Sequence, residues 1–595
     1  MHIEKTQSHG AVLAGFTLFC LTSLTGCSEK SPTREAAQVA GHPTFARDVA
    51  PILFQNCAYC HRAGQAAPFE LLTFADASKR AKQIAEAVES RFMPPWLPAP
   101  GFNHFQGERR LTEDQIATLK AWAATGAPEG NAADLPAPPT FASEWQLGQP
   151  DLIVRMPEPY ALPADGPDIY RNFVLPIPTD RVRYVRAMEF RPGNARAIHH
   201  AFFAVDRTSE AHRQDLLDPE PGFGGMHLPA SGEVPDGQFF SWQPGKMPMG
   251  GAASRAWSLN TNSWLVIQLH MQTTGKPERI QTEVGFYFSE QPATDITFKL
   301  GLSSYDLNVP TGATNFVAED AFELPADAEL LAILPHAHYV ARAMQGLATT
   351  PDGTSRWLLN IGRWDFNWQG EYWYQEPMQL TKGSRVGMRF FYDNSTNNLA
   401  NPSHPPKPVS YGLNSTDEMA ELWLIFRLKS PADRAAFNQA VVPKMAREVV
   451  TYNQKLLERD PANPQAWLRT GTALYALGQP ERAMEALRRA LQFSPQLDEA
   501  HYFLGLIAYD TGNLAKAQEE FGLAIEINRQ NYKAHGYLGL VYLRRGDYPR
   551  SEASLTEALR VNPNDQIARN NLKLLNEVRG GKAPDAGAVK PPGQP

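Results

Sequence analysis

The spacing of hydrophobic positions changes twice along this chain of 595 residues. Residues 44–135 place apolar side chains at helical intervals, as in the runs 45–54 and 116–123, which predicts a small all-α domain. Residues 141–429 instead carry short alternating or apolar runs separated by Pro, Gly, Asn and Asp, which is typical of antiparallel strands. Helical intervals return at residue 430. The pattern therefore predicts a multidomain protein in which a β region lies between two helical regions.

The central β region is long enough for two domains. We expect two tandem antiparallel β-sandwiches of the jelly-roll type, one over residues 141–290 and one over residues 291–429. The strand-like runs that support this expectation include residues 184–190, 264–269, 281–288 and 419–426.

The C-terminal region repeats every 34 residues. Small residues recur at this interval in two series, Gly471, Gly505 and Gly539, and Gly478, Gly512 and Gly546. This period resembles that of tetratricopeptide repeats, in which small residues let paired helices pack closely. Residues 430–578 are therefore expected to form an all-α solenoid, with 432–460 as part of a preceding repeat, 565–578 as a capping helix and 579–595 as a disordered tail. Such arrays bind proteins, or serve as a structural brace or dimer contact.

The first residues predict export. An apolar run over residues 11–20 is too short to span a bilayer, and it precedes Leu24-Thr25-Gly26-Cys27. Small residues before a cysteine resemble a bacterial lipoprotein signal, which implies cleavage before Cys27 and lipidation of that residue. Residues 1–27 would then be the signal, residues 28–43 a linker, and the protein lipid-anchored in the periplasm. An uncleaved membrane-proximal anchor is the alternative, and it also exports the chain.

The amino-acid composition narrows the range of possible functions and partners. A hydrophobic content of 43% is that of an ordinary globular protein, and a net charge of −7 without a basic patch argues against nucleic acid as a partner. Only four cysteines are present, and each has an expected use other than a structural disulfide. Stability is therefore expected to come from core burial and from metal.

Two of these cysteines form the sequence Cys57-Ala58-Tyr59-Cys60-His61. Two thiols at this spacing can add to the vinyl groups of haem, while the histidine supplies an axial nitrogen. A zinc site would need a second pair of ligands, and a redox dithiol has no reason to be followed by histidine. The pattern favours covalent attachment of a c-type haem.

The second axial ligand of this haem is expected to be Met93, which lies in the sequence Phe92-Met93-Pro94-Pro95-Trp96. The stretch resembles the methionine-plus-proline loop of mono-haem cytochromes c, where thioether ligation raises the reduction potential. His104 is the rival ligand, and Met93 as a packing residue is the plainer alternative. In size, motif and terminal helix, residues 44–135 resemble class I cytochrome c.

Histidines gather beside apolar residues in the β region. They occur in His199-His200, in Gln268-Leu269-His270 and in His336-Ala337-His338. A lone buried histidine is more often a hydrogen-bonded core residue than a ligand, but three groups in one exported chain favour metal binding. His336 and His338 project to the same face of a strand and can share an ion. His199 and His200 would point to opposite faces of a regular strand, so both can bind only if the chain bulges or twists there, or if they use different ring nitrogens.

The order of these groups, followed by Asp417-Glu418-Met419, resembles that in the copper type II, ascorbate-dependent monooxygenases. This family includes peptidylglycine α-hydroxylating and dopamine β-monooxygenases, and the resemblance covers residues 144–427. It implies hydroxylation of a substrate C–H bond, with an electron passing between two copper ions across a solvent-filled cleft between the two sandwiches. The implied ligands are His199, His200 and His270 for the electron-transfer copper, and His336, His338 and Met419 for the copper that binds dioxygen.

Two departures narrow what the resemblance implies. The family's domain disulfides cannot form if the four cysteines are used as expected. Peptide-amidating members place Arg two residues before the His-x-His pair, where this chain has Leu334, and their Asn and Tyr after the ligand methionine are Glu421 and Trp423 here. A glycine-extended peptide is therefore not expected as the substrate, and Leu334 and Trp423 favour a more apolar one.

The sequence is interpreted as that of an oxidoreductase, a copper monooxygenase that acts on an unidentified small molecule and dioxygen. Its electrons would come through the fused haem domain, from ascorbate, or from both. The alternatives are a non-enzymatic electron-transfer or copper-handling protein of the periplasm, and an assembly factor whose repeats carry the function. Met226, His227, Met247 and Met249, in a loop rich in Gly and Pro, are expected to be packing residues, and His404 a turn residue.

Overall fold

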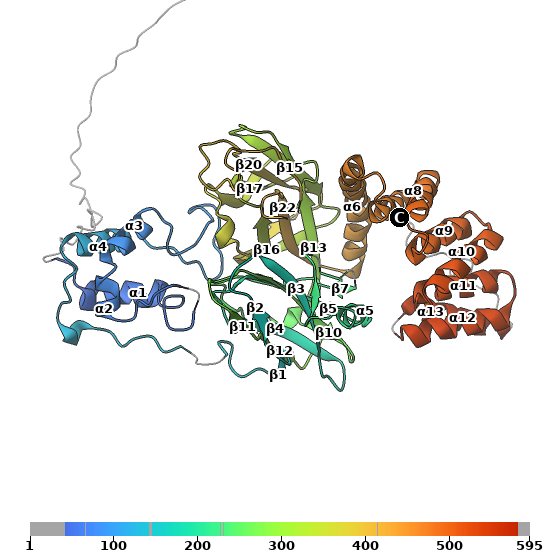
Figure 1. Ribbon diagram of the computed structural model, residues 1–595, viewed down its shortest axis with the longest axis horizontal. Coiled ribbons are helices and arrows are strands. Elements are labelled where there is room, and N and C mark those ends of the chain that lie inside the picture. The colour runs from blue at the N-terminus through green and yellow to red at the C-terminus, as the bar shows by residue number, and fades with distance from the viewer. Residues whose placement is uncertain are drawn as a thin grey trace, which may run out of the picture.

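The computed structural model describes residues 42–580, apart from Ala66, residues 142–144, His227, Ala230, Leu413 and Asn564. The expected signal with its lipidation site Cys27 lies outside the described residues, as do His227 and most of the expected linker and tail. Figure 1 shows a helical domain at one end of the molecule, the β region in the middle and further helices at the other end. Among the described residues, no helix combines the length and the apolar character needed to span a bilayer.

The N-terminal domain is helical, and apolar positions of its helices form its core. Leu53, Leu119 and Trp122 are fully buried in this core, and the side chain of Cys57 packs against it directly after the first α-helix. The elements are η1 (Phe45–Val49), α1 (Ala50–Asn56), α2 (Phe74–Ser78), α3 (Ala81–Glu89), α4 (Glu113–Ala124) and η2 (Ala132–Asp134).

Between α3 and α4, residues 96–110 leave the helical domain and pack on the second half of the β region. The amide N–H of Gln106 donates to the carbonyl oxygen of Trp373 (2.7 Å). The Phe105 ring is 2% exposed and lies 5.0 Å from the ring of Tyr374, inside the core of that half. The expected N-terminal domain therefore does not pack only on itself, and this insertion fixes it against the β region.

The first half of the β region, here called the N-terminal β unit, contains two larger antiparallel sheets. One has the strand order β1-β12-β4-β9 and the other β6-β3-β10-β5-β7, with β8 paired to β5. Side chains from both sheets, such as Phe286 and Ile267, meet in one core. The elements are β1 (Leu152–Arg155), β2 (Tyr160–Leu162), β3 (Ile169–Pro176), β4 (Arg183–Arg191), β5 (Ile198–Asp206), α5 (Glu210–Asp215), β6 (Phe223–Gly224), β7 (Gly232–Glu233), β8 (Ser241–Trp242), η3 (Ala253–Arg255), β9 (Trp257–Leu259), β10 (Trp264–Met271), β11 (Glu278–Ile280) and β12 (Glu283–Ser289).

The second half, the C-terminal β unit, repeats this plan with sheets ordered β13-β22-β16-β19 and β15-β20-β17-β18. Leu424 from the first sheet and Phe390 from the second share its core. The predicted β-rich central region is thus confirmed. The elements are β13 (Ile296–Ser303), β14 (Asn308–Val309), β15 (Phe316–Glu323), β16 (Ala328–His336), β17 (Ala341–Thr349), β18 (Ser355–Ile361), η4 (Phe366–Trp368), β19 (Tyr372–Leu380), β20 (Arg385–Tyr392), β21 (Val409–Ser410) and β22 (Glu421–Leu428).

After the β region the chain is helical, as predicted. The long helix α6 packs Phe437 against Phe298 and Phe426 of the C-terminal β unit, with ring centroids 5.0 and 5.9 Å apart, and it also contacts α7. The expected part-repeat over residues 432–460 is therefore one continuous helix that attaches the remaining helices to the β region (Figure 1). The helices are α6 (Pro431–Arg459), α7 (Pro464–Ala476), α8 (Pro480–Phe493), α9 (Asp498–Asp510), α10 (Leu514–Ile527), α11 (Tyr532–Arg544), α12 (Tyr548–Val561) and α13 (Gln566–Arg579).

Of the two glycine series that recur every 34 residues, Gly471, Gly505 and Gly539 lie where two helices of a pair touch, whereas Gly478, Gly512 and Gly546 adopt positive φ in the turns between helices. A β-carbon on Gly471 would lie 2.7 Å from Cγ of Leu487, and one on Gly505 would lie 2.7 Å from the ring of Phe521. Real β-carbons do not approach other atoms so closely, so any larger residue would push the paired helices apart. The 34-residue spacing of Gly471, Gly505 and Gly539 therefore repeats the same close contact between paired helices.

We expect Gly505→Ala to destabilise the C-terminal helices by about 1–3 kcal/mol, the usual cost of overpacking. Gly522→Ala on α10 is the matched control, because a β-carbon there meets no other atom within 4 Å. Denaturant unfolding of the full chain, followed by far-ultraviolet circular dichroism, measures both variants. Equal stability of the two variants would contradict the packing explanation.

Candidate functional site

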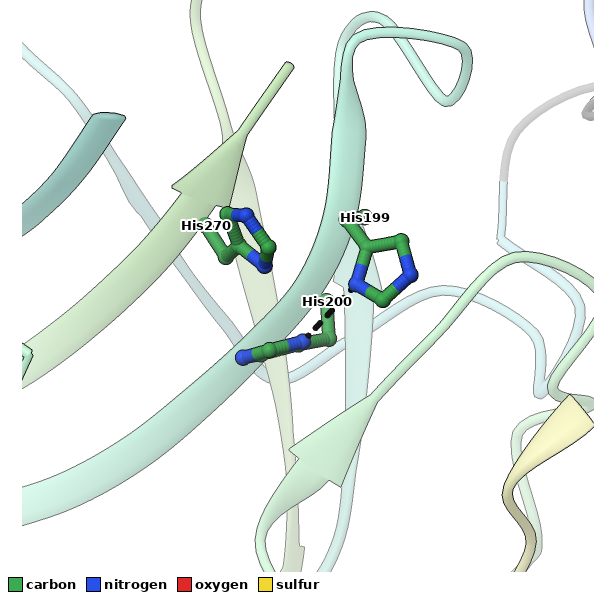
Figure 2. Close-up of side chains that lie close together, drawn as sticks. All are labelled: His199, His200 and His270. Carbon is green, nitrogen blue, oxygen red and sulfur yellow. Dashed lines mark hydrogen bonds between the residues drawn. The ribbon is translucent and has the colours of Figure 1, made fainter. Parts of the chain in front are cut away.

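His199, His200 and His270 meet where β5 begins and β10 ends (Figure 2). Three ring nitrogens, one from each residue, lie within 4.8 Å of one another, and the Nδ1 atoms of His199 and His200 are 3.1 Å apart. His200 pairs with His270 while Ile198 pairs with Met271, so His199 is the extra residue of a β-bulge. The bulge lets two adjacent histidines face the same point, which a regular strand would not allow.

One ring nitrogen of His270 has a hydrogen-bond partner among the described residues and the other has none. Nε2 lies 2.6 Å from Oδ2 of Asp168, and the ring stacks on Tyr170 at a centroid distance of 4.1 Å. Nδ1 is buried and has no hydrogen-bond partner among the described residues. Because an ionised carboxylate only accepts hydrogen bonds, Nε2 carries the hydrogen and Nδ1 keeps its lone pair. This orphaned lone pair beside two further imidazoles fits a metal ligand, and an all-imidazole donor set suits copper.

Burial keeps these imidazoles neutral. It lowers the pKa of His199 to about 4, with the nearby His270 adding to the effect, and it lowers the pKa of His200 well below its usual value. The pKa of His270 is also lowered by burial, although Asp168 opposes that shift. Since a metal ion binds only the unprotonated ring, these three side chains need no deprotonation to bind a cation at neutral pH.

The second pair of histidines lies in the C-terminal β unit. His336 ends β16 and His338 follows two residues later, with ring centroids 5.2 Å apart. Nδ1 of His336 lies 2.5 Å from Oε1 of Gln369, and Nδ1 of His338 lies 3.2 Å from the carbonyl oxygen of Asp417. Both acceptors favour a hydrogen on Nδ1, which leaves the lone pair of each ring on Nε2. Burial lowers the pKa of His338 to about 3, so this ring is neutral as well.

The buried carboxylate of Glu418 fixes His338 and Met419 relative to each other. It accepts hydrogen bonds from the backbone N–H groups of His338, Val340 (3.0 Å) and Met419 (2.8 Å). Burial raises the pKa of Glu418 to about 8, while these backbone hydrogen bonds oppose that shift. Sequence reasoning gave this residue no role, although an acidic residue directly before an apolar strand was an available signal.

Both groups of histidines open into one cavity of about 240 Å³ that is lined by both β units. His270 is not among the lining residues, but its ring centroid lies 4.8 Å from that of His199. Met226, expected to be a packing residue, also faces the cavity. The predicted copper ligands that line it are His199, His200, His336, His338 and Met419.

Phe366 of η4 lies between the two groups of histidines. Its ring centroid is 5.4 Å from that of His199 and 5.5 Å from that of His338. The two groups therefore share one wall residue, which neither histidine motif reveals. Sequence reasoning missed Phe366 because it lies in a short loop helix far from either motif along the chain.

The sequence Cys57-Ala58-Tyr59-Cys60-His61 forms a turn after α1, and neither thiol is in a disulfide within the part of the chain that the structure describes. Burial raises the pKa of Cys57 to about 12 and also raises that of Cys60, so both are unionised at neutral pH. The His61 side chain is buried, and its Nδ1 lies 3.0 Å from the carbonyl oxygen of Phe69. Nε2 of His61 therefore keeps a lone pair, and two thiols with one such imidazole fit covalent haem attachment.

The two rivals for the second haem ligand lie in different surroundings. Met93 is half-buried after α3, and its backbone N–H donates to the carbonyl oxygen of Ala87 (3.1 Å). His104 lies in the segment that packs on β19, and its side chain is 78% exposed beside Glu108. The structure thus places Met93 at the helical domain and His104 on the outside of the C-terminal β unit.

Three family models match the last part of the chain. One described as TPR repeat matches residues 471–512, and two described as Tetratricopeptide repeat match residues 498–531 and 538–589. The C-terminal helices are tetratricopeptide repeats. None of these three models matches residues before 471, and no curated protein matches the chain.

Solved structures similar to this chain include two described as crystal structures of MamA. They are 22% and 23% identical, cover 26% and 24% of this chain and 86% and 78% of their own chains, and both have a TM-score of 0.22. The first TPR of Spaghetti (RPAP3), bound to an HSP90 peptide, is 16% identical and covers 20% of this chain and 93% of its own, with a TM-score of 0.19.

We expect Asp168→Ala to lower the affinity of the His199, His200 and His270 group for copper by about 10–100-fold, because the variant loses the acceptor that orients His270. Asp165→Ala, an exposed acidic residue of the same loop, should leave the affinity unchanged. Competition titration with a chromogenic Cu(I) chelator measures both. Wild-type affinity in Asp168→Ala would contradict the orienting role.

We expect Glu418→Gln to destabilise the C-terminal β unit by about 1–3 kcal/mol, because the amide NH₂ would face backbone N–H groups that need acceptors. Glu376→Gln, an exposed position on β19, is the control. Thermal unfolding of both variants distinguishes them. A midpoint for Glu418→Gln equal to that of the control would show that the carboxylate is dispensable.

Proposed function

We propose that the chain is an exported copper-dependent monooxygenase that hydroxylates a C–H bond of a small apolar substrate. The observation that carries this proposal is the cavity into which both groups of predicted copper ligands open, each with ring nitrogens held ready by protein acceptors. The order of the motifs, which resembles that of the copper type II monooxygenases, supports the same function.

The two donor sets differ in a way that suits different tasks. One copper would be held by imidazoles alone, those of His199, His200 and His270. The other would be held by His336, His338 and the soft thioether of Met419. A thioether favours Cu(I), the state that reacts with dioxygen. Two such ions would supply the electron transfers of the overall reaction RH + O₂ + 2e⁻ + 2H⁺ → ROH + H₂O. The protein's own part is to orient the imidazoles and to shape the cavity.

The walls of the cavity support an apolar substrate. Leu334 and Trp423 are cross-strand neighbours on β16 and β22, beside the pair formed by His336 and Glu421. Among the residues that the structure describes, no arginine or lysine lines this cavity. A carboxylate group on a substrate would therefore find no cationic partner, while an apolar body would pack on the indole and leucine side chains.

The remaining parts of the chain are assigned accordingly. Cys57 and Cys60 would attach the haem and His61 and Met93 would bind its iron, so that electrons reach the coppers one at a time from within the same polypeptide. Cys27 would carry the lipid that anchors the protein in the periplasm. The repeats would bind a protein partner, since arrays of this kind expose an extended concave surface.

The test uses ethylbenzene as an apolar probe with a weak C–H bond, ¹⁸O₂, ascorbate and the haem- and copper-loaded full chain. We expect an alcohol that carries one ¹⁸O atom. Met419→Leu should lower its yield at least 100-fold while the copper at His199, His200 and His270 is retained, because the substitution removes only the thioether.

Met388→Leu, a buried methionine elsewhere in the C-terminal β unit, is the matched control and should keep the wild-type yield. Product without ¹⁸O, or an equal yield from Met419→Leu and wild type, would reject the monooxygenase and favour a copper-handling protein.

A further inference from the structure

We propose that residues 366–371, here called the junction segment, receive electrons from the haem and pass them first to the centre at His336, His338 and Met419. The proposal rests on the proposed function, because it assumes haem at Cys57 and Cys60 and copper at both histidine groups. It adds the identity of the first acceptor and the residues that connect it to the haem domain. The family resemblance assigns electron transfer to the other centre, so the proposal reverses the expected order for electrons that arrive from haem.

The junction segment contacts the predicted ligands directly. Its residue Gln369 accepts a hydrogen bond from Nδ1 of His336 (2.5 Å). Gln369 therefore contacts the ring of His336 directly, and His336 is the residue that would bind the copper. The segment also meets the other centre, because Asn367 has a side-chain hydrogen bond with His199 and Phe366 lies against the rings of His199 and His338.

The same segment contacts the helical domain. The ring of Trp368 packs edge-on against Phe92, with centroids 6.2 Å apart, and Phe92 precedes the expected haem ligand Met93. Phe92, the residue before the expected haem ligand Met93, thus touches Trp368, the residue before Gln369. This contact lies on the Met93 side of the helical domain.

A second contact lies on the Cys60 side and runs through a tight turn. Lys246 donates its backbone N–H to the carbonyl oxygen of Gln243 (3.0 Å), with Pro244 and Gly245 at the corner positions. Gly245 has φ +82°, which makes this a type II turn that requires glycine at its third position. A β-carbon on Gly245 would lie 3.5 Å from Sγ of Cys60, so the turn faces the atom that would form the haem thioether, with room for about one methyl group between them.

This turn is fastened to the junction segment at two points. The side-chain amide of Gln243 donates to the carbonyl oxygen of Gln369. Lys246 forms an ion pair with Glu371 (3.0 Å), and the two side chains are only 18% and 13% exposed. A largely buried ion pair with a hydrogen bond beside it holds the turn and the segment in one geometry.

The contacts form one short path from the haem attachment point to a copper ligand. It runs from Sγ of Cys60 to Gly245, along the backbone to Gln243, across a hydrogen bond to Gln369, and across a second to His336. Each transfer along it would oxidise one ferrous haem to ferric and reduce one Cu(II) at His336, His338 and Met419 to Cu(I). The competing entry point is the other centre, since Trp242 before the turn pairs with Ala201 beside His200.

The experiment follows electron transfer rather than turnover. Oxidised haem- and copper-loaded full chain receives less than one equivalent of electrons from a flash-generated one-electron reductant, without dioxygen or substrate. Haem absorbance reports how fast the ferrous haem is reoxidised, and electron paramagnetic resonance reports which Cu(II) signal is lost. We expect His336→Ala with His338→Ala to abolish the fast phase of reoxidation, and His199→Ala with His200→Ala to retain it.

Gln369→Leu should slow the fast phase at least tenfold at unchanged copper content, and Gln369→Glu, which keeps the acceptor oxygen, should restore it. Gln345→Leu on β17 is the matched control. Gly245→Val should also slow the phase, because it strains the turn and moves it from Cys60.

A fast phase that survives loss of His336 and His338 and disappears with His199 and His200 would overturn the proposal, as would a wild-type rate in Gln369→Leu. Normal transfer without any hydroxylated product would reject the proposed function alone. A chain that takes up neither haem nor copper would reject both.

Discussion

A buried histidine that binds a metal ion almost always has a fixed hydrogen-bond partner at its other ring nitrogen. Otherwise the ring would rotate, or leave a polar N–H unsatisfied in the interior. Here each partner is an acceptor: the carboxylate of Asp168 for His270, the amide oxygen of Gln369 for His336, and the Asp417 carbonyl for His338. His61 uses the carbonyl of Phe69 in the same way. The free lone pairs of His270, His336, His338 and His61 depend on these hydrogen bonds.

Those acceptors come from different parts of the fold, which is why the site needs so much of the chain. Asp168 precedes β3, Gln369 follows η4, and Asp417 lies before β22. Glu418 joins the last of these to the end of β16 by accepting backbone N–H groups from both. Because the sheets of two β units and one loop helix must be in place together, the cavity is a product of tertiary packing rather than of any single motif.

The sequence could predict the features that depend on local spacing: helical and strand periods, the glycine period, and the residue types able to bind copper or haem. It could not show how His199 and His200 face one point. That arrangement needs the bulge, and the bulge depends on pairing with β10, in which the partner of His200 is His270, 70 residues further along the chain. Nor could it place Phe366 between the histidine groups, or Phe105 in the core of the C-terminal β unit. Each of those contacts joins segments that share no sequence pattern.

We propose that this fold would hold two separate copper ions at one cavity. Crystals of the copper-loaded chain, measured with X-rays just above and just below the copper absorption edge, test it most directly. We expect two anomalous peaks, one among His199, His200 and His270 and one among His336, His338 and Met419. A single peak, or peaks away from these side chains, would contradict it.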